Sequence, residues 1–165
     1  MIPSNNSLAA SIMELRQFWQ RQAIACPPAD LAYVRQVAAT NSVVLPPDFE
    51  LLYSTVSGPP QLYPNYMDEN GFSLLPVEAL RTENKAVLVR TSHSAIQGQA
   101  AITEFVDYLH RSWVYGFIAD ADGSGYRIGI MPTKQVFKVL TTSLAEFLAW
   151  YVADADVLYD YEEPV

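Results

Sequence analysis

The chain has very little cysteine. One cysteine, Cys26, stands among 165 residues, so no disulfide can form within the chain and no zinc site can be built from several cysteines. Such sparse cysteine is typical of a reducing compartment. Cys26 is best interpreted as a small buried or half-buried residue at a helix end. A reactive thiol would need a nearby base, and His93 and His110 are distant in the sequence.

Long apolar runs and a leader sequence are also missing. Charged residues interrupt every apolar stretch well before the roughly 20 residues that a membrane-spanning helix needs. The first seven residues, MIPSNNS, lack the apolar core and small-residue cleavage site of a secretory signal. We therefore expect no transmembrane helix and no membrane partner, and we predict a cytoplasmic protein.

Positive charge is scarce. The chain has 10 basic and 18 acidic side chains, a net charge of −8, and its basic residues are scattered. Phosphate neutralisation needs clustered Lys and Arg, so the composition argues against direct binding of nucleic acid. An acidic surface keeps a protein in solution or steers it toward a basic partner, and the composition leaves both readings open.

Recognisable catalytic motifs are absent from the sequence. There is no nucleophile elbow, phosphate loop or dinucleotide fingerprint. The segment Asp120-x-Asp122-x-Ser124-Gly125 imitates the start of an EF-hand loop, but Met131 stands where the bidentate Glu belongs. A hairpin turn explains this segment better. We expect no catalytic residues, no cofactor and no metal site.

The length and the apolar fraction of 50% predict one folded domain. Apolar spacing, prolines and caps predict helices over 7–25, 29–39, 45–56 and 76–80, and one that Ser143 caps. Strands are predicted over 71–75, 86–89, 113–119, 126–130 and 136–140, with a hairpin turn at 120–125. We interpret 61–70 as an exposed loop and 91–99 as a loop, and 102–110 fits either a helix or a strand.

These elements favour the α+β class, with a mostly antiparallel central sheet, flanking helices and a single domain. Residues 1–40 are interpreted as a helical N-terminal extension and 154–165 as an acidic tail, while 83–112 has no settled structure. The tail carries five acids and no basic residue between Asp154 and Glu163. Carboxylates oppose the dipole at a helix C-terminus, so these acids do not serve helix stability. A contact with a basic protein surface and a solvated tail both remain open.

Exposed tyrosines and acids are the candidate contacts for a protein partner, since they combine contact area with charge. The predicted partner-binding residues are Tyr63, Tyr66, Asp68, Glu69, Asp120, Asp122, Asp154, Asp156, Asp160, Glu162 and Glu163.

Four segments occur in an order that matches a known family. They are Leu45-Pro46-Pro47-Asp48-Phe49 through Tyr53 and Gly58, Phe72 to Glu78, the hairpin Phe117–Ile130, and Ser143 to Leu148. In this order and spacing the chain resembles the SUKH superfamily, which joins bacterial immunity proteins to the yeast Smi/Knr cell-wall regulators. The chain departs from the family at Gly58-Pro59-Pro60, where further glycines are usual, and 83–112 matches no family segment.

The resemblance implies a mixed sheet surrounded by helices, with no catalytic residues to carry over. It implies an immunity protein that binds one cognate toxin, often a nuclease, and occupies its surface. From the acidic and tyrosine side chains we expect that surface to be a basic active-site cleft. Two alternatives stay open: a regulatory scaffold module that binds a host protein, and a small-molecule or enzymatic domain with a pocket between helix 45–56 and the sheet.

Overall fold

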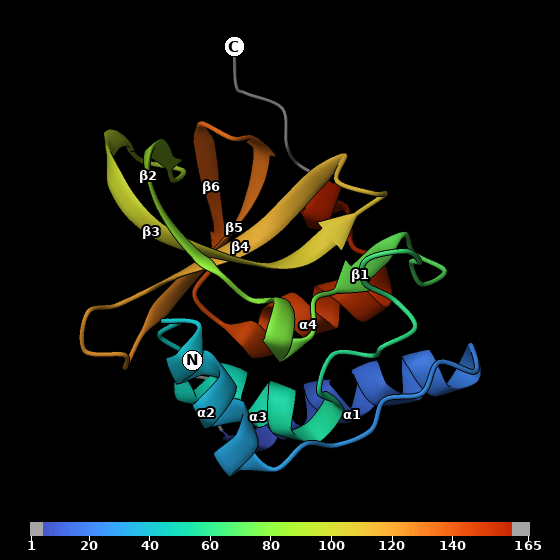
Figure 1. Ribbon diagram of the computed structural model, residues 1–165. Helices are drawn as coiled ribbons and strands as arrows, with labels where there is room; N and C mark the ends of the chain where they lie inside the picture. The colour runs from blue at the N-terminus through green and yellow to red at the C-terminus, as the bar shows by residue number, and fades with distance from the viewer. Residues whose placement is uncertain (1–4, 160–165) are drawn as a thin grey trace.

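The computed structural model describes residues 5–159. It shows an α+β domain in which helices cover one side of a curled sheet (Figure 1). The elements, in chain order, are α1 (Asn5–Arg21), α2 (Leu31–Thr40), α3 (Pro47–Val56), β1 (Phe72–Leu74), η1 (Val77–Ala79), β2 (Thr82–Arg90), β3 (Ala95–Tyr108), β4 (Trp113–Ala119), β5 (Tyr126–Thr133), β6 (Val136–Thr141), α4 (Leu144–Ala153) and η2 (Asp156–Tyr159).

Local sequence signals set the ends of α3 and α4. Pro47 occupies the first turn of α3, where its missing N–H has no helical partner to lose. The chain leaves α3 through Gly58, whose φ is +72° and where a Cβ atom would lie 2.4 Å from Cα of Pro76, so glycine is required there. Ser143 caps α4 by accepting a hydrogen bond from the Glu146 N–H at 3.1 Å. The predicted cap of α4 is confirmed, and α3 begins two residues after the predicted start at 45.

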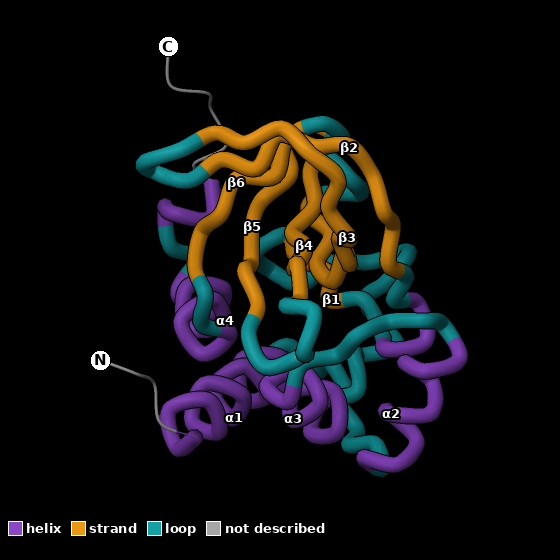
Figure 2. The backbone as a smooth tube through the Cα atoms, turned by 90° about the vertical axis from the view of Figure 1, so that its left-hand side faces the viewer, coloured by secondary structure: helices purple, strands orange, loops and turns teal. Residues whose placement is uncertain are grey.

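The sheet closes on itself through its longest strand. Its order is β1-β3-β2-β6-β5-β4, and β3 also pairs with β4. All pairs are antiparallel except β2–β6. An irregularity between Glu104 and Val106 bends β3, so that its first half pairs with β2 and its second half with β1 and β4. Figure 2 shows the resulting curl above α1, α2 and α3.

The two faces of the curled sheet carry two separate apolar clusters. The face toward the helices holds the main core, where Phe49 of α3 packs against the rings of Phe105, Phe117 and Tyr126 at centroid distances of 5.2, 4.1 and 5.2 Å. The inner face of the curl holds a small cluster of Val87, Ile102, Val114, Ile118, Met131 and Phe137. Aromatic rings occupy the space between Phe49 of α3 and the sheet, which argues against the hypothesis of a ligand pocket there.

The first helix belongs to the main core. Leu15 and Trp19 are fully buried, and Phe18 and Trp19 make edge-to-face contacts with Tyr151 of α4. Residues 5–40, interpreted as a helical N-terminal extension, thus contribute side chains of both α1 and α2 to the main core.

Two sequence predictions need correction, and one open assignment is decided. The segment 102–110, left open between helix and strand, lies in β3 to Tyr108, and residues 95–99 of the predicted loop also belong to β3. The strand forms there because β2 pairs with it over nine positions, although its side chains are exposed and give no apolar alternation. The predicted tail is ordered as far as Tyr159. Leu158 of η2 is fully buried, and the Tyr115 hydroxyl donates a hydrogen bond to the Leu158 carbonyl.

Candidate protein-binding surface

The loop between α3 and β1 is built around a buried carboxylate, Asp68, which is 4% exposed. Its oxygens accept hydrogen bonds from the Trp19 indole N–H at 3.2 Å and from the Tyr151 hydroxyl. They also accept from the backbone N–H groups of Asn70 and Phe72, both at 3.1 Å. The prediction that Asp68 is an exposed partner contact is therefore wrong, because its side chain is buried and both carboxylate oxygens accept hydrogen bonds inside the domain.

Burial dominates the electrostatics of this carboxylate. Desolvation raises the pKa of Asp68, and the hydrogen bonds from Tyr151 and Trp19 oppose that rise. Burial, followed by the proximity of Asp68, also raises the pKa of Tyr151 well above its ordinary value. A buried acceptor with several donors fixes the loop to α1 and α4 at once.

The fixed loop presents the side chains of Tyr66 and Glu69 outward. Tyr66 is 71% exposed and Glu69 is exposed, whereas Tyr63 is half-buried against the main core. The backbone around Glu69 is held, since its N–H donates to Gln22 Oε1 at 2.8 Å. Asn70 donates from its side chain to the carbonyl of Tyr151 at 3.1 Å, which joins the loop to the last turn of α4.

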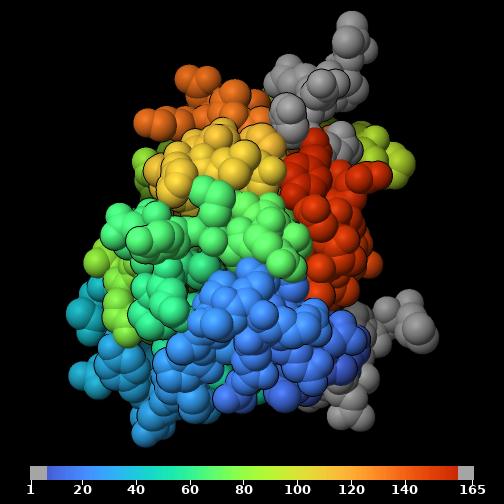
Figure 3. Space-filling view, turned by 90° about the vertical axis from the view of Figure 1, so that its right-hand side faces the viewer, coloured from blue at the N-terminus to red at the C-terminus, as the bar shows by residue number. Residues whose placement is uncertain are grey.

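Two further acids lie at that end of α4. Asp154 caps the helix in a left-handed conformation with φ 52°, and the Tyr159 hydroxyl donates to its carboxylate. Asp154 and Asp156 are both exposed. We call the four exposed residues Tyr66, Glu69, Asp154 and Asp156, which lie on the loop and after the end of α4 that Asn70 joins to it, the acidic end. In Figure 3 the green part of the chain, which includes the loop, adjoins α1, in blue, and the C-terminal part of the described chain, in red.

Asp120 and Asp122 lie elsewhere. They form the turn between β4 and β5, where the Asp120 N–H donates to the Gly125 carbonyl at 2.8 Å. Asp122 accepts from the backbone N–H and the hydroxyl of Ser124, at 3.0 and 2.7 Å, and these bonds lower the pKa of Asp122. The predicted hairpin turn is confirmed, and its bonds are those of a turn.

The turn lies near the opposite end of α4 from the acidic end. Tyr126, the first residue of β5, accepts from the N–H of Leu144, the first residue of α4, at 2.8 Å. The ten residues of α4 span about 15 Å. The candidate contacts therefore fall into two groups, one near each end of α4. A single flat interface at one end of the helix does not include both groups. Asp160, Glu162 and Glu163 lie outside the described residues.

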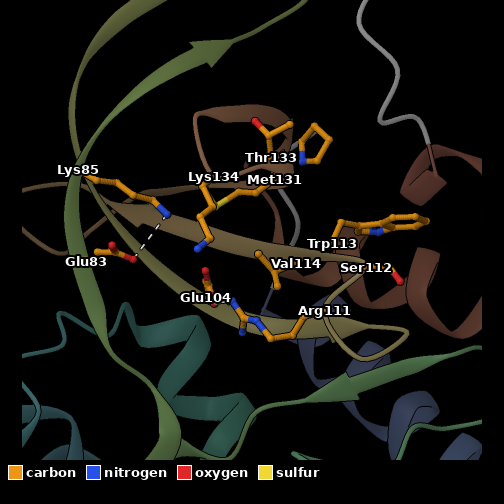
Figure 4. Close-up of a pocket in the computed structure, with 11 residues that line it drawn as sticks. Glu83, Lys85, Glu104, Arg111, Ser112, Trp113, Val114, Met131, Thr133 and Lys134 are labelled. Carbon is orange, nitrogen blue, oxygen red and sulfur yellow. Dashed lines mark hydrogen bonds and ion pairs between the residues drawn. The ribbon is translucent and has the colours of Figure 1, made fainter.

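Sequence reasoning missed a charged pocket on the inner face of the curl, with a volume of about 290 Å³. Figure 4 shows Lys85, Lys134 and Glu104 pointing toward one another from β2, the β5–β6 turn and β3. Lys85 lies 3.6 Å from Glu83, and Arg111 lies 3.3 Å from Glu104. No local signal marks this pocket, because its residues come from strands far apart in the sequence.

The titratable side chains form no metal site within residues 5–159, where no group of three or more His, Cys, Asp or Glu is arranged to hold an ion. His93 lies in the β2–β3 turn and His110 in the β3–β4 turn, at opposite ends of the 14-residue β3. No helix among these residues has the length and apolar character to span a membrane. Searches against family models, curated proteins and solved structures give no match.

Proposed function

We propose that this protein is an immunity protein that binds one cognate bacterial toxin domain in the cytoplasm and neutralises it without catalysis or a cofactor. The ordered resemblance to the SUKH superfamily supports this proposal, and so does the net charge of −8. The observation that carries it is the acidic end, where Tyr66 and Glu69 stand on a loop fixed by Asp68, and Asp154 and Asp156 follow the end of α4 to which Asn70 joins that loop.

A fixed loop favours binding because little conformational freedom is lost when the partner arrives. Tyr66 supplies a large aromatic contact, of the kind that dominates protein interfaces. Glu69, Asp154 and Asp156 supply negative charge that speeds encounter with a basic surface. Seated over a basic active-site cleft, the acidic end would exclude the toxin's substrate, and the immunity protein itself would not touch nucleic acid.

Co-expression tests the proposal. The protein is produced in a bacterial host together with the product of the adjacent gene, and growth and co-purification are scored. We expect rescue of growth and a stoichiometric complex. A neighbour that kills despite this protein and does not bind it, or a neighbour that is harmless, contradicts the proposal and favours a regulatory scaffold module instead.

A matched pair of tyrosine variants locates the contact. Tyr66→Ala removes the exposed ring of the acidic end and is expected to weaken the complex by roughly tenfold to a hundredfold. Tyr33→Ala removes another exposed tyrosine, 44% accessible on α2, and is expected to leave affinity unchanged. Equal losses, or a loss confined to Tyr33→Ala, would place the interface elsewhere.

A further inference from the structure

The first half of β3 has an unpaired edge. Within residues 5–159, β2 pairs with residues 95–103 on one side, and β4 on the other side reaches back only to Thr103. Beyond that point the two strands separate, and a hollow of about 300 Å³ opens between Ala101 and the segment 119–121. Figure 1 shows this half of β3 at the outer margin of the sheet.

The hydrogen-bond alternation identifies the backbone groups that face outward. Leu88, which is opposite Gln97, donates its N–H away from β3, to the carbonyl of Gln135. Leu88 and Gln97 are therefore a non-bonded pair. Three positions further along β2, the Thr91 N–H donates to the Ser94 carbonyl, so that pair is hydrogen-bonded. In an antiparallel ladder bonded and non-bonded pairs alternate. The N–H and C=O groups of Ala95, Gln97, Gln99 and Ala101 therefore point away from β2, toward the open edge.

This edge lacks the usual protection against strand pairing. Natural edges carry lysine, proline, bulges or inward charges, yet the run Ala95 to Ala101 has no charged residue and no proline. Residues 91–99 are exposed, and Ile96 is 66% accessible. Seven residues give an edge about 24 Å long.

We propose that a second copy of this chain pairs with this edge, antiparallel, so that two curled sheets join across a two-fold axis. The strand is self-complementary when Gly98 faces itself: Ile96 then meets Ala100, Gln97 meets Gln99, and Ala95 meets Ala101. No side chain stands at Gly98 to separate the strands, and an added Cβ there would have nothing within 4 Å. The inference concerns self-association and does not depend on the proposed function.

The chemistry predicts a weak, salt-strengthened dimer. One strand pair buries less than the roughly 1,200–2,000 Å² of a stable interface, so association is concentration-dependent. Each copy has a net charge of −8, and salt screens the repulsion between copies. Binding of a basic toxin at the acidic end has the opposite salt dependence, which separates the two events.

Sedimentation equilibrium of the full-length protein tests the proposal, from micromolar to millimolar concentration and at low and high salt. Gln97→Lys places a charge on the open edge and is expected to lower the association constant at least tenfold. Gln97→Pro removes an outward N–H and is expected to act likewise. Gln17→Lys makes the same substitution at an exposed position of α1, away from the open edge, and is expected to leave association unchanged.

Amide exchange in the native protein gives a residue-level readout. Raising the protein concentration is expected to slow exchange at Gln97, Gln99 and Ala101, while Ile96, Gly98 and Ala100 stay protected by β2 at every concentration. A protein that remains monomeric at millimolar concentration overturns the proposal, and so does a dimer that both Gln97 variants leave intact. If the unsubstituted protein is monomeric and Gln97→Pro abolishes toxin binding, the proposal is overturned and the edge is assigned to the toxin.

Discussion

The loop 61–70 and the segment 91–99, where β2 turns into β3 and which we call the ribbon, differ in an unexpected way. The loop without regular structure is anchored in the interior, whereas the regularly paired ribbon is exposed. The loop has no strand or long helix, yet Asp68 ties it to Trp19 and Tyr151 in the protein interior. The ribbon has regular pairing between β2 and β3, yet its residues 91–99 are all exposed. Burial of polar anchors, rather than regularity of the backbone, decides which segment is fixed in place.

The largest expected effect comes from breaking the anchor of the loop. Asp68→Ala leaves the Trp19 indole N–H and the Tyr151 hydroxyl buried without their acceptor, together with the N–H of Phe72. Unsatisfied buried donors cost about 1–3 kcal/mol each, so we expect a loss of about 3–5 kcal/mol in the free energy of unfolding, measured with urea. The neighbouring exposed Glu69→Ala is the control, with a change within about 0.5 kcal/mol. A similar small change for Asp68→Ala would contradict the anchor.

Alkaline pH tests the buried tyrosine hydroxyls of the domain, of which that of Tyr151 belongs to the anchor. Burial raises the pKa values of Tyr53, Tyr115, Tyr126 and Tyr151. The unfolded chain loses these protons near pH 10, while the folded chain keeps them, so the stability they contribute is present below about pH 10 and is lost as the pH rises. Each such tyrosine lowers the free energy of unfolding by up to about 1.4 kcal/mol per pH unit.

The measurement is urea unfolding between pH 8 and 11.5. Tyr151→Phe is expected to show a shallower decline above pH 10 than the unsubstituted protein, because one proton fewer distinguishes the two states. A stability that stays flat across this range would show that the tyrosines ionise equally in the folded and unfolded chain.

The smallest effects are expected in the ribbon. Ile96→Ala truncates a side chain that is 66% exposed, so the free energy of unfolding should change by no more than about 0.5 kcal/mol. Val87→Ala, on the partner strand, removes two methyl groups from the fully buried inner cluster and should cost about 1.5–3 kcal/mol. Thermal or urea unfolding of the two variants at low protein concentration compares them, and equal costs would mean that the ribbon is more buried than described.

The same contrast explains what could be predicted from the sequence. The turn at 120–125 and the cap at Ser143 are local signals, so the hairpin and α4 were predicted within a few residues. The first half of β3 was missed because Gly98 and the exposed glutamines carry no strand pattern, and pairing with β2 decides its conformation.

The anchor was missed for a different reason. Its donors Trp19 and Tyr151 lie 49 and 83 residues from Asp68 along the chain, so no local pattern reveals them. The one nearby signal is the segment Asp68-x-Asn70-Gly71, which is typical of a side-chain-stabilised turn before a strand. Four of the predicted contacts in the loop and at the end of α4 do lie at the surface: Tyr66, Glu69, Asp154 and Asp156. In the same loop Asp68 is buried and Tyr63 is half-buried.

The most direct test of the proposed function measures association rates with the cognate toxin domain at several salt concentrations. Two isosteric variants each remove two charges: Glu69→Gln with Asp156→Asn at the acidic end, and Asp120→Asn with Asp122→Asn in the distant turn. We predict that the first pair slows association about threefold to tenfold at low salt and flattens its salt dependence, while the second pair changes neither. A slower rate with the turn variant alone, or unchanged rates with both, would contradict binding through the acidic end.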